Sequence, residues 1–482
     1  MLYLMCIVVC CRRCFQHNGN SLKQLHLMWI KEVGTVRKRM LAIVVVGCLF
    51  LSACGGIGAD LSNSLNPPKP SGEFYHIQSA LEDSVGGEFR LVYPLSGDYR
   101  AAINAVDVDG DGVLEAFAFY STDTGDKSTA MHINHIKKNG EKWESVADIQ
   151  VTASGVESVE LCRLDNSGSK KLIVNWSKFS SLENQLSVYS VDSGILTEVT
   201  SEPFSTYLTC DFDSDGISEI VSVYMDTAAK TATATLTTLN DKGFAHKSTC
   251  AADPFVLSYS TPKMTRLTDG TAALFIDAQK KGGTITEMFG IKDGELSKLI
   301  KSSVIGENLR TFRASDAKAQ DFNGDGCLDI PLTTKLPKIT GDENSDNVYM
   351  TTWNSFDGKA LTPLKSALIN YTDGYHMVIP DSWVGNFGVW RNPASTERII
   401  FRWDSAVNRV GEEIMRIELI KLSDWSADPE RYSSKYSEIT RNAEYVFAAR
   451  LSNSALTPDI TTLRESFTLI DDFVSTKKVG AK

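Results

Sequence analysis

Three short acidic loops contain the residues whose types and spacing are best suited to chemistry. They are DVDGDGVLE from Asp107, DFDSDGISE from Asp211 and DFNGDGCLD from Asp321. Each has oxygen-bearing side chains at loop positions 1, 3 and 5, a glycine at position 6 and an acid at position 9. Calcium takes about six to eight oxygen ligands, so a loop of this kind supplies most of a calcium site. The glycine allows the sharp turn that such a loop needs.

The predicted calcium ligands are four acidic or amide side chains in each loop, together with the residue at position 7 through its backbone carbonyl. They are Asp107, Asp109, Asp111, Val113 and Glu115; Asp211, Asp213, Asp215, Ile217 and Glu219; and Asp321, Asn323, Asp325, Cys327 and Asp329.

An EF-hand begins in the same way but ends with an acid at position 12, followed by a helix. Position 12 is Ala118, Ser222 or Leu332 here, and strand-like runs such as AFAFY follow the loops. The sequence therefore predicts calcium loops that lead into strands. The other interpretation of any one copy, an acidic turn that binds nothing, is weakened because the pattern occurs three times.

Two further segments have the loop pattern without its full set of ligands. In RLDNSGSKK, Arg163 and Lys171 stand where the first and last acids would be, so the Lys171 ammonium could occupy the place of the ion. RLTDGTAALFI from Arg266 keeps only the turn and the following strand. The five segments begin 48 to 56 residues apart, a period typical of propeller blades and similar repeated units.

The loops resemble FG-GAP or VCBS repeats, the calcium-loop blades of integrin-like β-propellers, and the chain resembles bacterial lipoproteins that carry them. The resemblance covers roughly residues 67–365. Together with the repeat count it implies a mainly β fold, with a propeller of about five to six blades over 74–365. Calcium would be structural in such a protein. From about Asn370 longer strands without acidic loops predict a separate small α+β domain over 370–475.

The segment 37–54, RKRMLAIVVVGCLFLSAC, has a basic start, an apolar run and small residues before a cysteine, which is typical of a lipoprotein signal peptide. The lipoprotein resemblance implies a lipid on Cys54 and an anchor on the extracytoplasmic face of the cell membrane. The alternative, a transmembrane helix, would need an apolar run of about 20 residues. Residues 1–36 are interpreted as a mis-annotated N-terminal extension, and 55–73 as a flexible tether.

The net charge of −11 disfavours nucleic acid as a partner, because phosphate binding requires a basic surface. The other cysteines after Cys54 have no metal-binding spacing, and the sequence leaves open whether any of them form disulfides. They are Cys162, Cys210, Cys250 and Cys327.

Local patterns predict a helix over 75–83, with Ile77 and Leu81 on one face, and a final helix capped by Thr457. His132 and His135 are expected on opposite faces of a strand and exposed. Five tryptophans in the C-terminal half either pack in a core, as is commoner, or form a platform for sugars. They are Trp353, Trp383, Trp390, Trp403 and Trp425.

No nucleophile elbow, phosphate-binding loop or zinc-protease motif is found, and the clustered carboxylates are already assigned to calcium. The favoured function is a surface-anchored binding module for a protein or glycan ligand, with no enzymatic activity. The alternative is a cell-surface polysaccharide hydrolase or lyase. A third possibility is an envelope assembly or sensing factor whose C-terminal domain docks a membrane partner.

Overall fold

The computed structural model describes residues 72–470, apart from short gaps at 124–128, 179–183, 193–194, 241, 268, 339–346 and 392–394. The predicted extension, signal peptide, lipid site Cys54 and almost all of the tether lie outside the described residues. The described chain is mainly β, and its six sheets belong to one compact unit, His76–Lys482. Among the described residues, no helix has the length and apolar character needed to cross a membrane.

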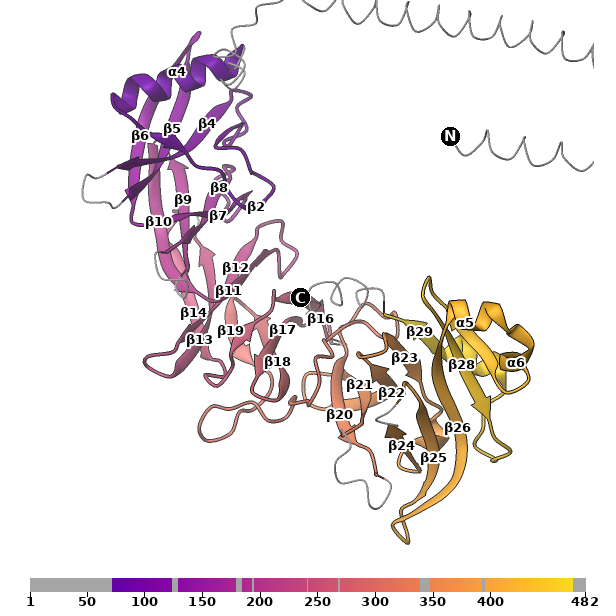
Figure 1. The fold of residues 1–482 in the computed structure, drawn as a ribbon. Coiled ribbons are helices and arrows are strands. Elements are labelled where there is room, and N and C mark those ends of the chain that lie inside the picture. Colours follow the sequence, from indigo (N-terminus) through magenta and orange to yellow (C-terminus); the bar gives the residue numbers. More distant parts are fainter. Residues whose placement is uncertain are drawn as a thin grey trace, which may run out of the picture. The chain divides into compact units, whose positions relative to one another are not determined.

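The first three sheets follow one another along the chain (Figure 1). Sheet 1 consists of β1 (Arg90–Leu91), β3 (Ile103–Val106), β4 (Glu115–Asp123), β5 (Thr129–Asn139) and β6 (Lys142–Val151). Sheet 2 consists of β2 (Ser96–Gly97), β7 (Gly155–Cys162), β8 (Lys171–Ser177), β9 (Asn184–Asp192) and β10 (Ile195–Phe204). Sheet 3 consists of β11 (Thr206–Cys210), β12 (Glu219–Asp226), β13 (Thr231–Leu239) and β14 (Ala245–Ala251). All the pairs are antiparallel except β2 with β7.

The other three sheets continue this order and are antiparallel throughout. Sheet 4 consists of β15 (Ser258–Tyr259), β16 (Lys263–Arg266), β17 (Ala272–Lys280), β18 (Gly283–Lys292) and β19 (Glu295–Lys298). Sheet 5 consists of β20 (Ile330–Lys335), β21 (Tyr349–Phe356), β22 (Leu361–Asn370), β23 (Tyr375–Val378) and β29 (Phe467–Leu469). Sheet 6 consists of β24 (Phe387–Arg391), β25 (Arg398–Asp404), β26 (Arg409–Lys421), β27 (Ser437–Arg441) and β28 (Tyr445–Leu451).

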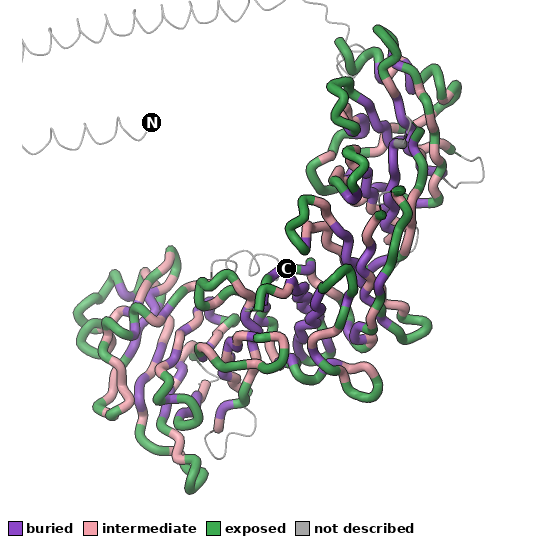
Figure 2. The backbone as a smooth tube through the Cα atoms, turned by 180° about the vertical axis from the view of Figure 1, so that it is seen from behind, coloured by how far each residue is buried: buried purple, intermediate pink, exposed green. Residues whose placement is uncertain are grey.

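Each inner sheet buries both of its faces against a neighbouring sheet. Successive side chains of a strand point to opposite faces, so β17 places Leu274 and Ile276 in a core shared with sheet 3. The alternate residues Ala273 and Phe275 lie in a core shared with sheet 5. Figure 2 shows the result, with buried residues along the strands and exposed residues concentrated in the loops. Burial of both faces explains why the first five residues of β17, AALFI, are apolar without interruption.

Helices cover the outer faces of the first and last sheets. Helix α4 (Glu73–Val85) packs Ile77 and Leu81 against sheet 1, which confirms the predicted N-terminal helix (Figure 1). At sheet 6 the cover is provided by the apolar side chains of α5 (Leu422–Ala427) and α6 (Pro429–Ser433). Within the described residues, no hydrophobic cluster joins sheet 1 to sheet 6.

The structure does not divide the chain at residues 365–370, because that boundary lies inside β22. Strand β29, near the end of the described chain, pairs with β23 and completes sheet 5. Sheets 5 and 6 share one large core, with the short 3₁₀ helix η2 (Asp381–Trp383) contributing Trp383. The residues predicted as a small separate domain therefore build part of the same stack of sheets.

The final helix, α7 (Ile460–Ser466), begins later than predicted. Its cap is Asp459, whose Oδ1 accepts hydrogen bonds from the backbone amides of Thr461 and Thr462 at 2.9 and 3.0 Å. The predicted cap, Thr457, instead donates its hydroxyl proton to the carbonyl of Ile414 at 2.8 Å. The predicted cap was wrong because the helix begins at Ile460, so that Asp459, and not Thr457, directly precedes it.

The expectation for the two histidines is confirmed only in part. His132 and His135 lie on opposite faces as predicted, but the exposure expected for both is wrong: His135 is fully buried and stacks on Phe117, and His132 is only 14% exposed. Burial, followed by the charge of Lys137, lowers the pKa of His135 to about 4.

Of the five tryptophans, Trp353, Trp383 and Trp425 are buried and the other two are half-buried. Core packing is therefore their role, and they form no exposed platform.

Candidate metal-binding loops

The three acidic loops occupy equivalent places in the fold. Loop 107–115 joins β3 to β4, loop 211–219 joins β11 to β12, and loop 321–329 leads directly into β20. The glycine at position 6 has a positive φ in each: 83° at Gly112, 87° at Gly216 and 85° at Gly326. Other residues rarely adopt this conformation, which accounts for the glycine in the motif.

The first aspartate of each loop organises the surrounding backbone. Asp107 accepts a hydrogen bond from the amide of Gly110 at Oδ1, at 2.7 Å, and from the amide of Gly112 at Oδ2, at 3.0 Å. Asp211 and Asp321 hold the amides of their own loops in the same way. These bonds fix the carboxylates in place and leave further lone pairs for another partner.

The acid at position 9 is the most buried of the predicted ligands in each loop. Glu115, Glu219 and Asp329 are 0%, 9% and 0% exposed, and one oxygen of each accepts a hydrogen bond of 3.0 Å from the amide at position 2. The second oxygen has no hydrogen-bond partner in Glu115 or in Asp329. Such an oxygen is costly to bury, and a bound cation would offset that cost.

The surroundings of these carboxylates already favour a cation. Burial, and then the nearby loop carboxylates, raise the pKa of Glu219 to about 7, and they also raise the pKa of Asp329. The Lys137 ammonium lies 3.4 Å from Oε1 of Glu115 and supplies some compensating charge. A divalent ion bound among the carboxylates would offset both the cost of burying their negative charges and the repulsion between them.

The structure brings together two acidic triads that could hold a metal ion. In Asp107, Asp109 and Glu115 one oxygen of each carboxylate lies within 4.8 Å of the others, and the same holds for Asp211, Asp213 and Glu219. The third loop has the same internal hydrogen bonds, but position 3 is an amide, Asn323.

The residues at positions 5 and 7 hold each other in all three loops. The position-5 carboxylates of Asp111, Asp215 and Asp325 accept the position-7 amides of Val113, Ile217 and Cys327 at 2.7 to 2.8 Å. Metal coordination by the carbonyls of these three position-7 residues stays a prediction, as does coordination by the position-5 carboxylates.

The loop from Arg163 has a cation of its own. Lys171, at position 9, is fully buried, and its ammonium lies 3.0 Å from Oδ2 of Asp165 and 3.1 Å from Oγ of Ser167. Although burial opposes it, hydrogen bonds from Ser167 and Lys171 lower the pKa of Asp165. The ammonium thus contacts positions 3 and 5 of its loop, as the sequence suggested.

The five loops are also linked to one another, which the sequence analysis did not predict. The bonds between successive loops are Lys170 N to Val108 O (2.8 Å), Ser218 N to Arg163 O (2.8 Å), Arg266 Nη2 to Ser214 Oγ (2.7 Å) and Cys327 Sγ to Arg266 O (3.0 Å). Loops with an acid at position 9 therefore alternate with loops that contribute Lys171 or Arg266. Cys327 takes part as a thiol, and all four described cysteines are free.

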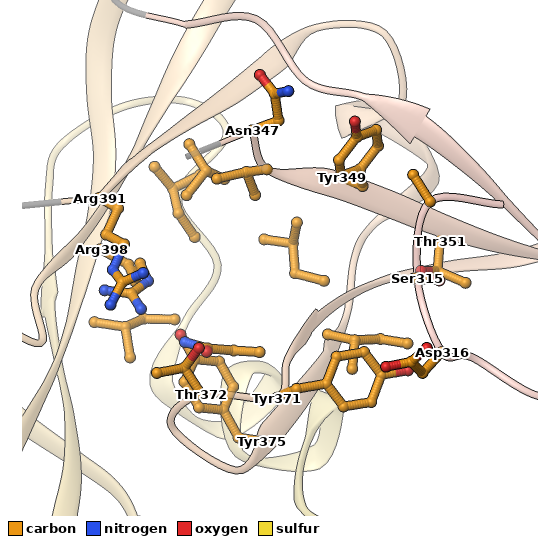
Figure 3. Close-up of a pocket in the computed structure, with 18 residues that line it drawn as sticks. Ser315, Asp316, Asn347, Tyr349, Thr351, Tyr371, Thr372, Tyr375, Arg391 and Arg398 are labelled. Atoms are coloured by element: carbon orange, nitrogen blue, oxygen red, sulfur yellow. The ribbon is translucent and has the colours of Figure 1, made fainter. Parts of the chain in front are cut away.

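A pocket of about 370 Å³ lies between sheets 5 and 6 (Figure 3). Its buried floor is aliphatic and includes Leu368, Val389 and Ile400. Arg391 and Arg398 lie side by side on one wall, and Tyr371 points toward Asp316 on the opposite wall. This site could not be predicted from the sequence, because β22–β23 and β24–β25 supply its walls and no short motif joins them.

Comparisons with known proteins assign no family to the chain. No family model matches it, and no curated protein matches its sequence. Among solved structures it is distantly similar to an exotype rhamnogalacturonan lyase, YesX, at 11% identity and a TM-score of 0.28, covering 68% of this chain and 84% of that one. A Bacillus licheniformis rhamnogalacturonan lyase gives 13% identity and 0.30, covering 68% and 77%. The Dos1 propeller gives 10% and 0.26, covering 60% and 78%. Likenesses at this level support no inference about activity.

Proposed function

We propose that this protein is a calcium-stabilised, membrane-anchored binding protein whose sheets are blades of the FG-GAP or VCBS type. The observation that carries the proposal is the buried acid at position 9 of each acidic loop, where one oxygen of Glu115 and one of Asp329 lack a hydrogen bond. Calcium prefers oxygen ligands in flexible loops, and the hydrogen-bonded carboxylates suit it better than the softer transition metals.

Calcium in this proposal is structural. Sites in extracellular modules have dissociation constants of roughly 0.1 to 1 mM and stay filled outside cells. An ion that binds only the folded state at several times its dissociation constant adds on the order of 1 kcal/mol per site. The ions would brace the linked row of loops where the strands of successive sheets begin.

The test is a calcium titration of the full-length protein by calorimetry, with thermal melts in calcium and in chelator. About three sites and a higher melting temperature in calcium are expected, both abolished in the triple variant Asp107→Ala, Asp211→Ala and Asp321→Ala. The matched control is Asp357→Ala, since Asp357 accepts from Lys359 and Ala360 in an ordinary exposed turn. Absence of calcium uptake by the unmodified protein would refute the proposal.

The membrane anchor is a separate part of the proposal and rests on the sequence from 37 to 54. A lipid on Cys54 would place the protein on the extracytoplasmic face of the cell membrane. Cys54→Ser should release the protein into the soluble fraction and remove the mass of the lipid from the mature N-terminal peptide. Membrane retention of this variant would count against the lipid anchor.

A second candidate function is a polysaccharide hydrolase or lyase, and the pocket between sheets 5 and 6 is the observation that favours it. Its size and its mixture of an apolar floor with a few polar groups are typical of small-molecule sites. Asp316 is an acidic group on its wall. Release of reducing ends or unsaturated sugars from cell-wall glycans, lost in Asp316→Ala, would establish this activity.

A further inference from the structure

We infer that the pocket between sheets 5 and 6 binds a small sugar acid, with its carboxylate against Arg391 and Arg398 and its hydroxyl groups toward Asp316 and Tyr371. The inference rests on the proposed binding role of the protein but is independent of calcium, because none of the calcium-loop residues lines the pocket.

The two arginines form a wall suited to an anion. They lie at neighbouring ends of β24 and β25, where Arg391 pairs with Arg398 in the sheet, so both guanidinium groups reach the same part of the pocket (Figure 3). Arg398 Nη2 donates to Oδ2 of Asp373 at 2.8 Å, and Asn370 Nδ2 donates to the same oxygen at 2.7 Å, which fixes the guanidinium in place. Planar guanidinium groups match the geometry of a carboxylate.

The opposite wall has the complementary preference. Asp316 is exposed and held by Gln279, whose Nε2 donates to its Oδ1 at 3.0 Å. Burial, followed by the charge of Asp316, raises the pKa of Tyr371 to about 12, so its hydroxyl stays protonated. A ligand end that faces this wall must donate hydrogen bonds to a carboxylate, which a hydroxyl group does and a second acid does not.

The remaining lining favours a sugar over an apolar acid. Neutral hydroxyl and amide groups lie around the pocket, where they can bond several hydroxyl groups of one ligand; they are Ser315, Asn347, Tyr349 and Thr372. The aliphatic floor of Leu368, Val389 and Ile400 can contact the C–H face of a pyranose ring. A volume of about 370 Å³ is enough for a monosaccharide-sized ligand.

The experiment is a calorimetric titration of the full-length protein in calcium with D-glucuronate, and with D-glucose as the neutral match. Glucuronate is expected to bind and glucose to bind at least tenfold more weakly, since glucose lacks the carboxylate. Arg391→Gln should weaken glucuronate about 10- to 100-fold, the effect of removing a charge-assisted hydrogen bond. The control Arg402→Gln lies on the same strand as Arg398, pairs with Glu412 outside the pocket, and should change nothing.

Three outcomes would overturn the inference: no heat from glucuronate at millimolar concentration, equal binding of glucose, or an Arg391→Gln variant that melts normally and binds normally. Hexanoate serves as the apolar acid, and binding of hexanoate without glucuronate would also reject a sugar ligand. If Arg391→Gln melts abnormally, Tyr371→Phe takes its place, with weaker glucuronate binding expected and unchanged binding rejecting the assignment. Failure here leaves the calcium titration unaffected, so the two proposals can fail separately.

Discussion

The loops 107–115 and 163–171 have the same place in successive sheets but balance their buried charge in opposite ways. In the first, position 9 is the buried acid Glu115, and one of its oxygens has no hydrogen-bond partner. In the second, position 9 is Lys171, whose ammonium contacts Asp165 and Ser167. The second loop carries a cation of its own at position 9, whereas the cation nearest to Glu115 is Lys137, which lies outside the first loop at 3.4 Å. The comparison shows that the same turn forms around either sign of charge at position 9.

The largest expected effect is that of Lys171→Met. This change leaves Asp165, which is 2% exposed, without its counterion, and breaking a buried pair costs about 3 to 5 kcal/mol. The loss in free energy of unfolding, measured with urea, should be the same in calcium and in chelator. Lys170→Met is the control, because its contribution to the row of loops is a backbone amide. A loss no larger than that of the control would mean that the ammonium is not the counterion.

The next effect is a pH dependence confined to the chelated protein. Because burial raises the pKa of Glu219 to about 7 from an unfolded value near 4.5, the folded state binds the proton more tightly. Protonation of Glu219 therefore stabilises the folded state. This stabilisation is fully present below pH 4.5 and is lost as the pH rises through 7, so the free energy of unfolding falls by roughly 2 to 4 kcal/mol.

Chemical denaturation from pH 4.5 to 8 measures this loss. Glu219→Gln should remove that component of the pH dependence. Calcium should reverse the loss at high pH, since the metal requires the ionised carboxylate. A chelated protein whose stability profile is unchanged by Glu219→Gln would contradict the assignment.

A smaller effect on stability is expected for Glu115→Gln, and its sign should differ between calcium and chelator. In calcium the variant should lose about 1 kcal/mol, the contribution of one filled site. In chelator it should lose nothing or gain, because a neutral amide is less costly to bury than an incompletely paired carboxylate. Thermal melts in the two conditions measure the difference, and the exposed Glu144→Gln is the control. Equal losses in both conditions would argue against a metal at this loop.

The smallest effect, and the most direct test of the comparison, is conversion of one loop type into the other. The double variant Arg163→Asp with Lys171→Glu restores acids at positions 1 and 9. It should bind about one more calcium ion than the unmodified protein in a calorimetric titration. Arg163→Asp alone should add none, because the Lys171 ammonium still contacts Asp165. An unchanged stoichiometry in the double variant would show that other parts of the loop were also lost.

The features that could be predicted from sequence depend on neighbouring residues. The acidic loops, the strands that follow them and the helix α4 could all be predicted from residue spacing over about ten residues, and the structure contains each of them. In the same way, the identity of position 9 was enough to suggest that the Lys171 ammonium lies within its loop, where it contacts Asp165 and Ser167. The turn glycine and the acids in such a loop interact within the motif itself.

The features that were missed depend on contacts between distant segments. The boundary near residue 370 was placed where the loop motif ends, yet β22 pairs with β23 across it, and β29 joins the same sheet from the end of the described chain. His135 is buried because sheet 2 covers it, and its own strand gives no sign of that. The pocket walls come from separate hairpins, so only the packed sheets bring Arg391 and Asp316 to one cavity.

The helices at the two ends of the stack have a consequence for how such a chain can change in evolution. An inner sheet presents an apolar face on each side, so a duplicated unit inserted between two others would find both faces matched. Because α4 and α5–α6 cover the outer faces of the terminal sheets, an inner unit could be gained or lost without exposing an apolar face at either of them. Relatives of this protein could therefore be longer or shorter by whole units while keeping the same end helices.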